Sequence, residues 1–136
     1  MKRLVLYISV LSVTFGCSAE LPKHMPAKIF SATDVAKDPV GFDGQEIHVK
    51  GYMVADLMNR PFFYLSRSDA DRQLEYESID IVSGSEAVRS RLRNIQKVTC
   101  VVVDGRFEAY IHDKVMVGTF SKYGALTVND FEVCGE

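Results

Sequence analysis

Three cysteines carry most of the reactive side-chain chemistry in this chain of 136 residues: Cys17, Cys100 and Cys134. A cysteine can take a lipid, bind a metal as the thiolate, or join a second cysteine in a disulfide. Zinc sites need cysteine and histidine clustered at close spacing, and the sequence has no such cluster. The spacing therefore leaves two kinds of chemistry, lipidation at Cys17 and a disulfide between Cys100 and Cys134.

The N-terminus has the features of an export signal. Lys2 and Arg3 precede an apolar run from Leu4 to Phe15, and small residues follow it. This run is shorter than the ~20 apolar residues that a membrane-spanning helix needs. A charged start, a short apolar run and small residues are typical of a secretory signal peptide, which we predict over residues 1–16.

The segment Val13–Cys17 resembles a bacterial lipobox, in which cleavage before the cysteine leaves a lipid anchor on that residue. Ser18 implies, by resemblance to Gram-negative lipoproteins, passage to the periplasmic side of the outer membrane. Ordinary cleavage after Ala19 is the alternative, and it would release a soluble periplasmic protein. Residues 17–29, which contain two prolines, are then a lipid-tethered linker to the domain that we predict over residues 30–136.

The charge balance argues against a nucleic acid partner. Removing sixteen residues from the 136 leaves 120, near the usual size of one domain. Lys2 and Arg3 leave with the signal peptide, so the 16 basic residues fall to 14, against 18 acidic ones. A protein with this mild negative charge lacks the basic surface that nucleic acid binding requires.

The sequence contains no motif of an enzyme or a cofactor site. His24, His48 and His112 stand in no motif that pairs one of them with a nucleophile. A glycine-rich phosphate loop and a nucleophile elbow are also missing. The acidic run from Asp69 to Glu77 lacks the glycine and the spacing of a calcium loop. We therefore expect a protein that is not an enzyme and binds no cofactor or metal.

Hydrophobic periodicity predicts a mainly β domain with two helices. A short helix begins after Ser31, where Asp34 completes a capping box, and it ends before Pro39. A second capping pattern, Ser83 with Glu86, begins another helix. Alternating apolar residues predict five strands, over residues 46–53, 62–66, 78–82, 98–110 and 126–134.

Two glycines in the middle of strands point to a closed sheet. The pattern Ile47-x-Val49-x-Gly51 in the first strand recurs around Gly105 in the fourth strand. A glycine on the inward face of a strand usually marks a sharp bend such as a barrel corner. Five such strands, with a helix between the third and the fourth, match a five-stranded Greek-key barrel of the OB-fold type.

A further set of positions runs through most of the mature chain: Asp34–Val35, Asp38–Pro39, Phe42–Tyr52, Phe63–Ser66 and Val101–Phe107. In these runs the chain resembles small exported bacterial OB-fold lipoproteins, and it is similar to the tRNA-anticodon-like OB group. These positions shape the fold, so the resemblance implies an OB-fold and no particular activity.

In a barrel of this type the fourth and fifth strands are antiparallel neighbours. A connection centred near residue 118 then places Cys100 beside Cys134, and we predict a non-hydrogen-bonded pair with close side chains. The oxidising compartment of an exported protein favours a disulfide there. Two reduced, buried cysteines are the alternative.

Two surfaces are candidates for binding. The first is a set of residues on or beside the first two strands, on the face that OB-folds often use: Tyr52, Phe62, Tyr64 and Arg67. Packing of the aromatic pair under a loop or against the terminal helix is the alternative for this set. The second is the pair Arg89 and Arg93, which share a helix face and mildly repel each other, so that a bound anion would stabilise them. A solvated helix face is the alternative for this pair.

We expect a non-catalytic interaction module that contacts another envelope protein. The candidate surfaces are the face of the first three strands and the loop over Ile111–Ala125. An OB domain for an oligosaccharide or a small anionic envelope ligand is one alternative, and a structural role in the envelope is another. A broad exposed apolar patch would favour a protein partner, and exposed aromatic residues a sugar.

Overall fold

The computed structural model describes residues 28–110 and 121–135. The predicted signal peptide, Cys17 and nearly all of the predicted linker lie outside these ranges, as do residues 111–120 of the predicted loop. The first described strand begins at Ile29, one residue before the predicted start of the domain.

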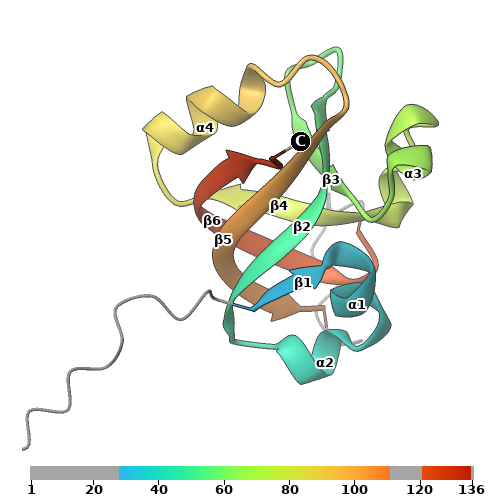
Figure 1. Ribbon diagram of the computed structural model, residues 1–136, viewed down its shortest axis with the longest axis vertical. Coiled ribbons are helices and arrows are strands. Elements are labelled where there is room, and N and C mark those ends of the chain that lie inside the picture. The colour runs from blue at the N-terminus through green and yellow to red at the C-terminus, as the bar shows by residue number, and fades with distance from the viewer. Residues whose placement is uncertain (1–27, 111–120, 136) are drawn as a thin grey trace, which may run out of the picture.

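The described chain is mainly β with several small helices, as predicted (Figure 1). The elements follow in the order β1 (Ile29–Ser31), α1 (Ala32–Lys37), α2 (Pro39–Phe42), β2 (Glu46–Ala55), β3 (Pro61–Tyr64), α3 (Arg67–Asp71), the 3₁₀ helix η1 (Glu75–Glu77), β4 (Ser78–Ser83), α4 (Glu86–Arg93), β5 (Thr99–Ala109) and β6 (Gly124–Val133). Each predicted strand and helix has a counterpart in this order. The sequence did not predict β1, α2, α3 or η1.

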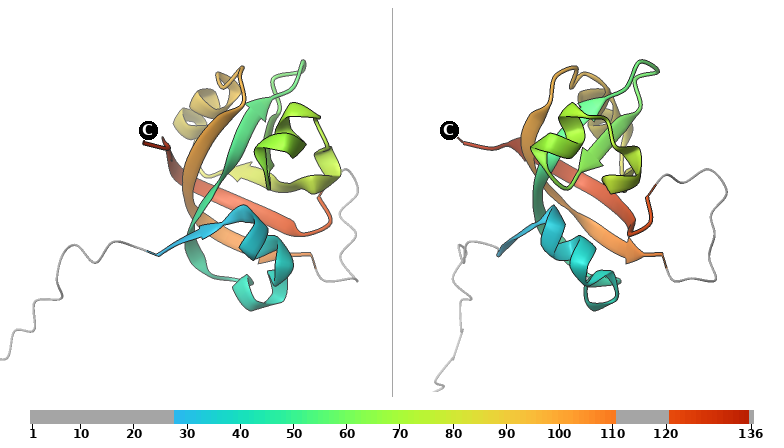
Figure 2. Two further views of the ribbon diagram at one scale, coloured as in Figure 1. Left: turned by 45° about the vertical axis from the view of Figure 1, so that its right-hand side comes forward. Right: turned by 90° about the vertical axis from the view of Figure 1, so that its right-hand side faces the viewer.

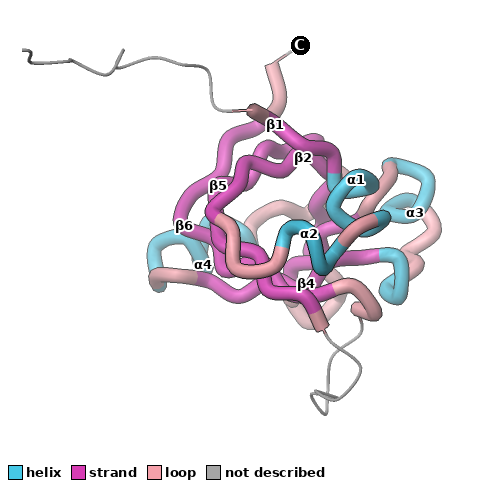
Figure 3. Tube along the Cα trace, turned by 90° about the horizontal axis from the view of Figure 1, so that it is seen from below, coloured by secondary structure: helices cyan, strands magenta, loops and turns pink. Residues whose placement is uncertain are grey.

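Six strands of the described chain form one sheet that closes on itself (Figures 2 and 3). The order is β1-β2-β3-β4-β6-β5, and β5 also pairs with β2. The prediction of five strands is therefore wrong by one. The extra strand, β1, pairs in parallel with β2 at His48–Lys50, an edge that β3 leaves free because it joins β2 only from Tyr52 onward.

The core fills the inside of this closed sheet, and helices contribute to it from both ends. Its buried residues are Ala32, Val35, Ile47, Val49, Met53, Phe63, Ile79, Val88, Leu92, Val101, Val103, Phe107, Leu126, Val128 and Phe131. Ala32 and Val35 come from α1, and Val88 and Leu92 come from α4. Figure 3 views the sheet from the end where α1 and α2 lie, and Figure 1 shows α4 toward the other end.

The caps of the two predicted helices can be compared with the sequence patterns. The predicted capping box of α1 is confirmed, because Ser31 accepts from the Asp34 amide and Asp34 accepts from the Ser31 amide. The N-cap of α4 is Ser85, which accepts from the Val88 amide. The prediction of Ser83 as that cap is wrong, because Ser83 still belongs to β4.

The two mid-strand glycines lie where close packing excludes a side chain. A Cβ atom at Gly51 would lie 2.6 Å from the ring of Phe63, and one at Gly105 would lie 2.3 Å from the carbonyl oxygen of Thr127. The β5–β6 register shifts between Asp104 and Gly105, which marks a bulge. Close packing thus explains both glycines, and the register is irregular at Gly105.

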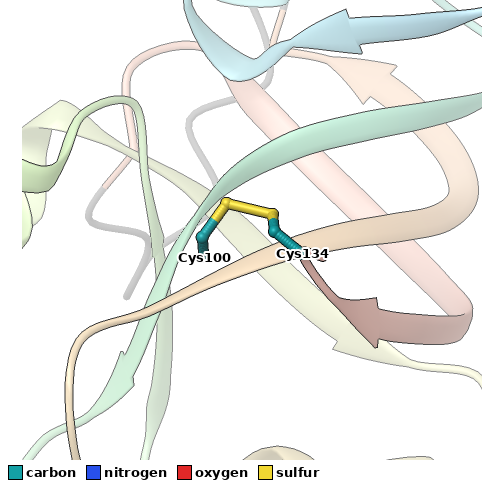
Figure 4. The surroundings of a disulfide bond; sticks show 2 residues. All are labelled: Cys100 and Cys134. Atoms are coloured by element: carbon teal, nitrogen blue, oxygen red, sulfur yellow. A yellow bond between two sulfur atoms is a disulfide. The ribbon is translucent and has the colours of Figure 1, made fainter. Parts of the chain in front are cut away.

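The disulfide between Cys100 and Cys134 is present, with a Cα–Cα distance of 5.4 Å (Figure 4). It links the start of β5 to the residue after β6. The Cys134 amide donates to the Cys100 carbonyl at 2.9 Å. The prediction of a non-hydrogen-bonded pair is therefore wrong, and the Cα separation is typical of the hydrogen-bonded kind.

Candidate functional site

The predicted aromatic binding face is covered by the chain itself. Phe62 and Tyr64 point away from the main core, as expected, but they are only 6% and 2% exposed. They form a second apolar cluster with Ala70 of α3, and Tyr52 is half-buried against it. The expectation that these aromatic side chains are open to a ligand is therefore wrong.

The reason is α3, a helix that the sequence patterns did not predict. Ser66 caps this helix by accepting from the Asp69 amide, the same spacing as in the Ser31–Asp34 cap of α1. That repeated pattern was the available signal for the helix. Arg67 is exposed on its first turn. Burial, followed by the charges of nearby carboxylates, raises the pKa of Tyr64 to about 12, as expected for a covered phenol.

A different hollow lies between the β2–β3 hairpin, the end of β4 and α4. Its volume is about 500 Å³, within the usual range of ligand sites. We name it the arginine groove, and its lining residues are Met58, Asn59, Arg60, Pro61, Ile81, Val82, Ser83, Arg89 and Arg93. Arg89 and Arg93, the predicted anion patch, thus lie in one hollow, and the fold adds Arg60 from a distant segment.

The three arginines of the arginine groove differ in how firmly they are paired. Arg89 pairs with Glu86 at 3.0 Å on its own helix, and Arg60 pairs with Asp56 at 2.6 Å. Within residues 28–110 and 121–135, Arg93 has no ion pair. The exposed Arg89–Glu86 pair contributes at most about 1 kcal/mol, so a ligand can replace it at little cost.

The hairpin wall of the groove is held rigidly by one carboxylate. Asp56 accepts from the amides of Met58 and Arg60, both at 2.8 Å, and from the Arg60 side chain. Burial opposes the charged form of Asp56, but these donors outweigh it and lower its pKa. The turn holds Leu57 and Met58 out in solvent, at 105% and 73% exposure. Large apolar side chains are unusual at a turn, where polar residues are favoured.

The two walls of the groove are also tied to each other. The Ala55 amide donates to the Ile95 carbonyl at 2.8 Å, which joins the end of β2 to the segment after α4. The Gln96 amide group donates to the Arg93 carbonyl at 2.8 Å and to the side chain of Asn59 at 3.4 Å. The groove is therefore part of the folded framework.

Arg91, on the same helix, serves another purpose. It pairs with Asp130 at 2.7 Å and lies 4.4 Å from the ring centre of Phe131, so it packs α4 against β6. The hydrogen bond from Arg91 lowers the pKa of Asp130. Arg91 therefore does not add to the charge of the arginine groove.

A second hollow of about 220 Å³ is lined by residues of β2, β5 and β6. Its titratable residues are His48, Asp104, Asp130 and Glu132, and Nε2 of His48 lies 3.8 Å from Oδ1 of Asp104. Across the described ranges, no group of three or more His, Cys, Asp or Glu residues is placed to hold a metal ion. The described helices also include none with the length and hydrophobicity that a membrane crossing requires.

Glu77 has a structural role that the sequence patterns did not predict. Its carboxylate accepts from the Tyr123 hydroxyl at 2.5 Å and from the Lys122 ammonium at 2.9 Å. These two donors lower the pKa of Glu77. Nearby, the Tyr110 hydroxyl donates to Asp80 at 2.6 Å. Together these bonds attach β4 to the end of β5 and the start of β6.

No protein-family model and no curated protein sequence matches this chain. Among solved structures, it is similar to an aspartyl-tRNA synthetase from Leishmania major Friedlin, with a TM-score of 0.50 and 7% sequence identity. The likeness covers 85% of this chain and 22% of that chain, so this chain spans about a fifth of the synthetase. At this identity the likeness supports an OB-like fold alone.

Proposed function

We propose that this chain is a lipid-anchored interaction module of the bacterial envelope, which binds another envelope protein through the arginine groove and catalyses no reaction. The observation that carries the proposal is the composition of the groove, where three arginines surround exposed apolar side chains. Arginine and exposed apolar residues together are typical of protein–protein interfaces.

We further propose that strands β2 to β6 form a five-stranded Greek-key barrel of the OB type, with β1 as an addition. The closure of the sheet through β2 and β5, and the position of α4 between β4 and β5, support this assignment.

The direction in which the chain enters the domain agrees with this function. Ile29 is level with His48 at the start of β2, whereas the groove lies beyond Ala55 at the other end of that strand. The seven residue steps from His48 to Ala55 span roughly 23 Å. Figures 1 and 2 show β1 and the β2–β3 hairpin toward opposite ends. A domain anchored through Cys17 would therefore present the groove away from the membrane.

A protein partner fits the groove better than the other ligands considered. Sugar and single-stranded nucleic acid sites usually offer exposed aromatic rings for stacking. The lining of the arginine groove contains no aromatic residue, and Phe62 and Tyr64 are buried. Leu57 and Met58 instead extend an apolar tip beside the arginines, and a protein segment can cover both.

Photo-crosslinking in cells tests the proposal. A photoreactive residue at Val82, which is 51% exposed in the groove, is compared with one at Val40, which is 71% exposed on α2. We expect a discrete protein adduct from position 82 and none from position 40. An adduct that glycosidase or nuclease removes, or no adduct from position 82, would contradict a protein partner.

The membrane anchor needs a separate test. Cys17→Ala removes the residue that would carry the lipid, so we expect the protein to move from the membrane fraction to the soluble periplasmic fraction. Ser18→Ala serves as the neighbouring control and should leave the protein with the membranes. Membrane association that persists in the Cys17→Ala protein would contradict the anchor.

A further inference from the structure

The arginine groove exists because β3 and β4 separate. The two strands pair only at Tyr64–Ser78 and Phe63–Ile79. Continuing that register would pair Pro61 with Ile81, but no pairing is formed there. Residues 58–61 and 81–83 line the groove instead, one segment on each side.

Successive residues of β3 direct their backbone N–H and C=O groups alternately to β4 and to β2, and this alternation explains why the pairing with β4 stops at Pro61. The Leu65 amide donates to the Glu77 carbonyl, so Leu65 faces β4 and so does every second residue before it in β3. The Arg60 carbonyl, by contrast, accepts from Asp56 on the β2 side. Pro61 therefore turns toward β4, and because proline has no N–H it cannot donate across that gap.

The same alternation along β4 leaves some of its backbone groups without a partner strand. The Gly84 amide donates to the Val128 carbonyl, so the even-numbered residues of β4 face β6. Ile81 and Ser83 then turn their N–H and C=O groups toward the groove. The register gives these groups no partner on β3 within the described residues. An edge with such groups is a template for another strand.

We propose that the arginine groove binds an extended acidic segment of another protein, which adds as a strand to the edge of β4 at Ile81 and Ser83. This inference rests on the proposed function and names the chemistry of the partner. Main-chain hydrogen bonds to the open edge provide affinity, and alternate side chains of the segment provide specificity.

The lining of the groove determines the character of that segment. It contains three arginines and no acidic residue, so carboxylates in the segment complement it. Val82 and Met58 offer apolar contact to the intervening side chains. Lipid headgroups and phosphorylated sugars match the arginines, but they have no peptide groups for the open backbone of β4.

Model peptides test the strand addition. The probe is a capped hexapeptide of alternating Val and Asp. It is titrated to about 1 mM into the ¹⁵N-labelled protein, which is purified in the form that cells produce after processing. We expect shifts at the amides of Ile81 and Ser83, together with slower solvent exchange. Two matched peptides are the controls, one with Lys in place of Asp and one with N-methyl groups along the pairing edge.

Both control peptides should bind at least roughly tenfold more weakly. Equal binding by the N-methylated peptide would overturn strand addition, and equal binding by the Lys peptide would overturn the acidic specificity. No response to the Asp peptide at Ile81 and Ser83 would also overturn the proposal. A protein adduct from Val82 would then still support an interaction module with another binding mode.

Pro61→Val supplies a second test on the protein side. Valine restores the missing N–H toward Ile81 and favours a strand, so β3 and β4 can pair further and occupy the edge. We expect the Asp peptide to bind at least roughly tenfold more weakly, with the melting temperature retained. Pro39→Val in α2 is the control and should bind normally. Unchanged binding by the Pro61→Val protein would overturn the proposal.

Discussion

The contacts between paired strands, which we call seams, differ sharply in length around the closed sheet. β5 pairs with β2 from Glu46–Arg106 to Met53–Thr99, and with β6 along almost its whole length. The disulfide between Cys100 and Cys134 then closes the end of that second seam. β3 and β4, by contrast, share two residue pairs before they separate.

This difference shows how a small closed sheet can hold its fold while one pair of its strands separates early. Most of the core side chains and both long ladders surround β5, so that half can maintain the structure. The β3–β4 seam is then free to remain incomplete. Regions used for binding commonly come from the less strongly paired parts of a fold.

The largest expected difference is in side-chain packing. Phe107 is fully buried beside β6, and Phe62 is buried in the small cluster under α3. We expect Phe107→Ala to lower the free energy of unfolding by about 4 kcal/mol, and Phe62→Ala by roughly half of that, because a short surface helix can collapse into the gap. Chemical denaturation measures both losses. Equal losses would contradict the division of the sheet into a strongly paired half around β5 and a weakly paired half at β3 and β4.

The disulfide should produce the next largest effect. Cys134→Ser opens a loop of 34 residues, which we expect to lower the free energy of unfolding by about 3–4 kcal/mol. Cys100→Ser should cause the same loss. In reductant, the wild-type protein and both variants should melt at similar temperatures. A loss that is equally large in reductant would mean that the cysteines stabilise the β5–β6 pairing by packing alone.

The smallest effect concerns the bonds that attach β4 to β6. The pKa of Glu77 is lowered in the folded state by Tyr123 and Lys122. Its contribution is therefore present above the ordinary value of 4.5 and is lost as the pH falls through the lowered folded-state value. We expect Glu77→Gln to lower stability by at most about 1 kcal/mol at pH 7 and by less at pH 3.

Unfolding measured at both pH values tests this assignment. Glu86→Gln is the comparison, because the Glu86 side chain is 74% exposed and its pair with Arg89 should matter less. A Glu77→Gln loss of the same size at both pH values would show that the carboxylate charge is not what attaches β4.

Much of the fold was predictable because its signals are local. Alternating apolar residues and the Ser31–Asp34 capping box depend on neighbours in the chain, and the structure confirms them. The link between Cys100 and Cys134 followed from the order of the strands. The strand β1 was missed because three residues carry no usable period, and it forms only where β2 has a free edge.

The candidate site was predictable only in part. Arg89 and Arg93 were found because they lie four residues apart on one helix, but Arg60 comes from a hairpin that meets them only in the folded chain. Phe62 and Tyr64 were assigned to the correct face of the strand, yet the exposure was wrong because α3 folds over them. Pro61 carried the signal of an edge strand, and only the register shows what that edge leaves open.

The parallel strand β1 has a mechanical consequence. In a chain anchored at its N-terminus and held at the groove, tension would enter through Lys28 and reach β1 before any other element. β1 joins β2 over three residues, while β2 remains fixed to β5 over its full ladder. We expect β1 to detach first in a force-extension measurement while the ladder between β2 and β5 still holds, so tension on the tether would leave the groove intact.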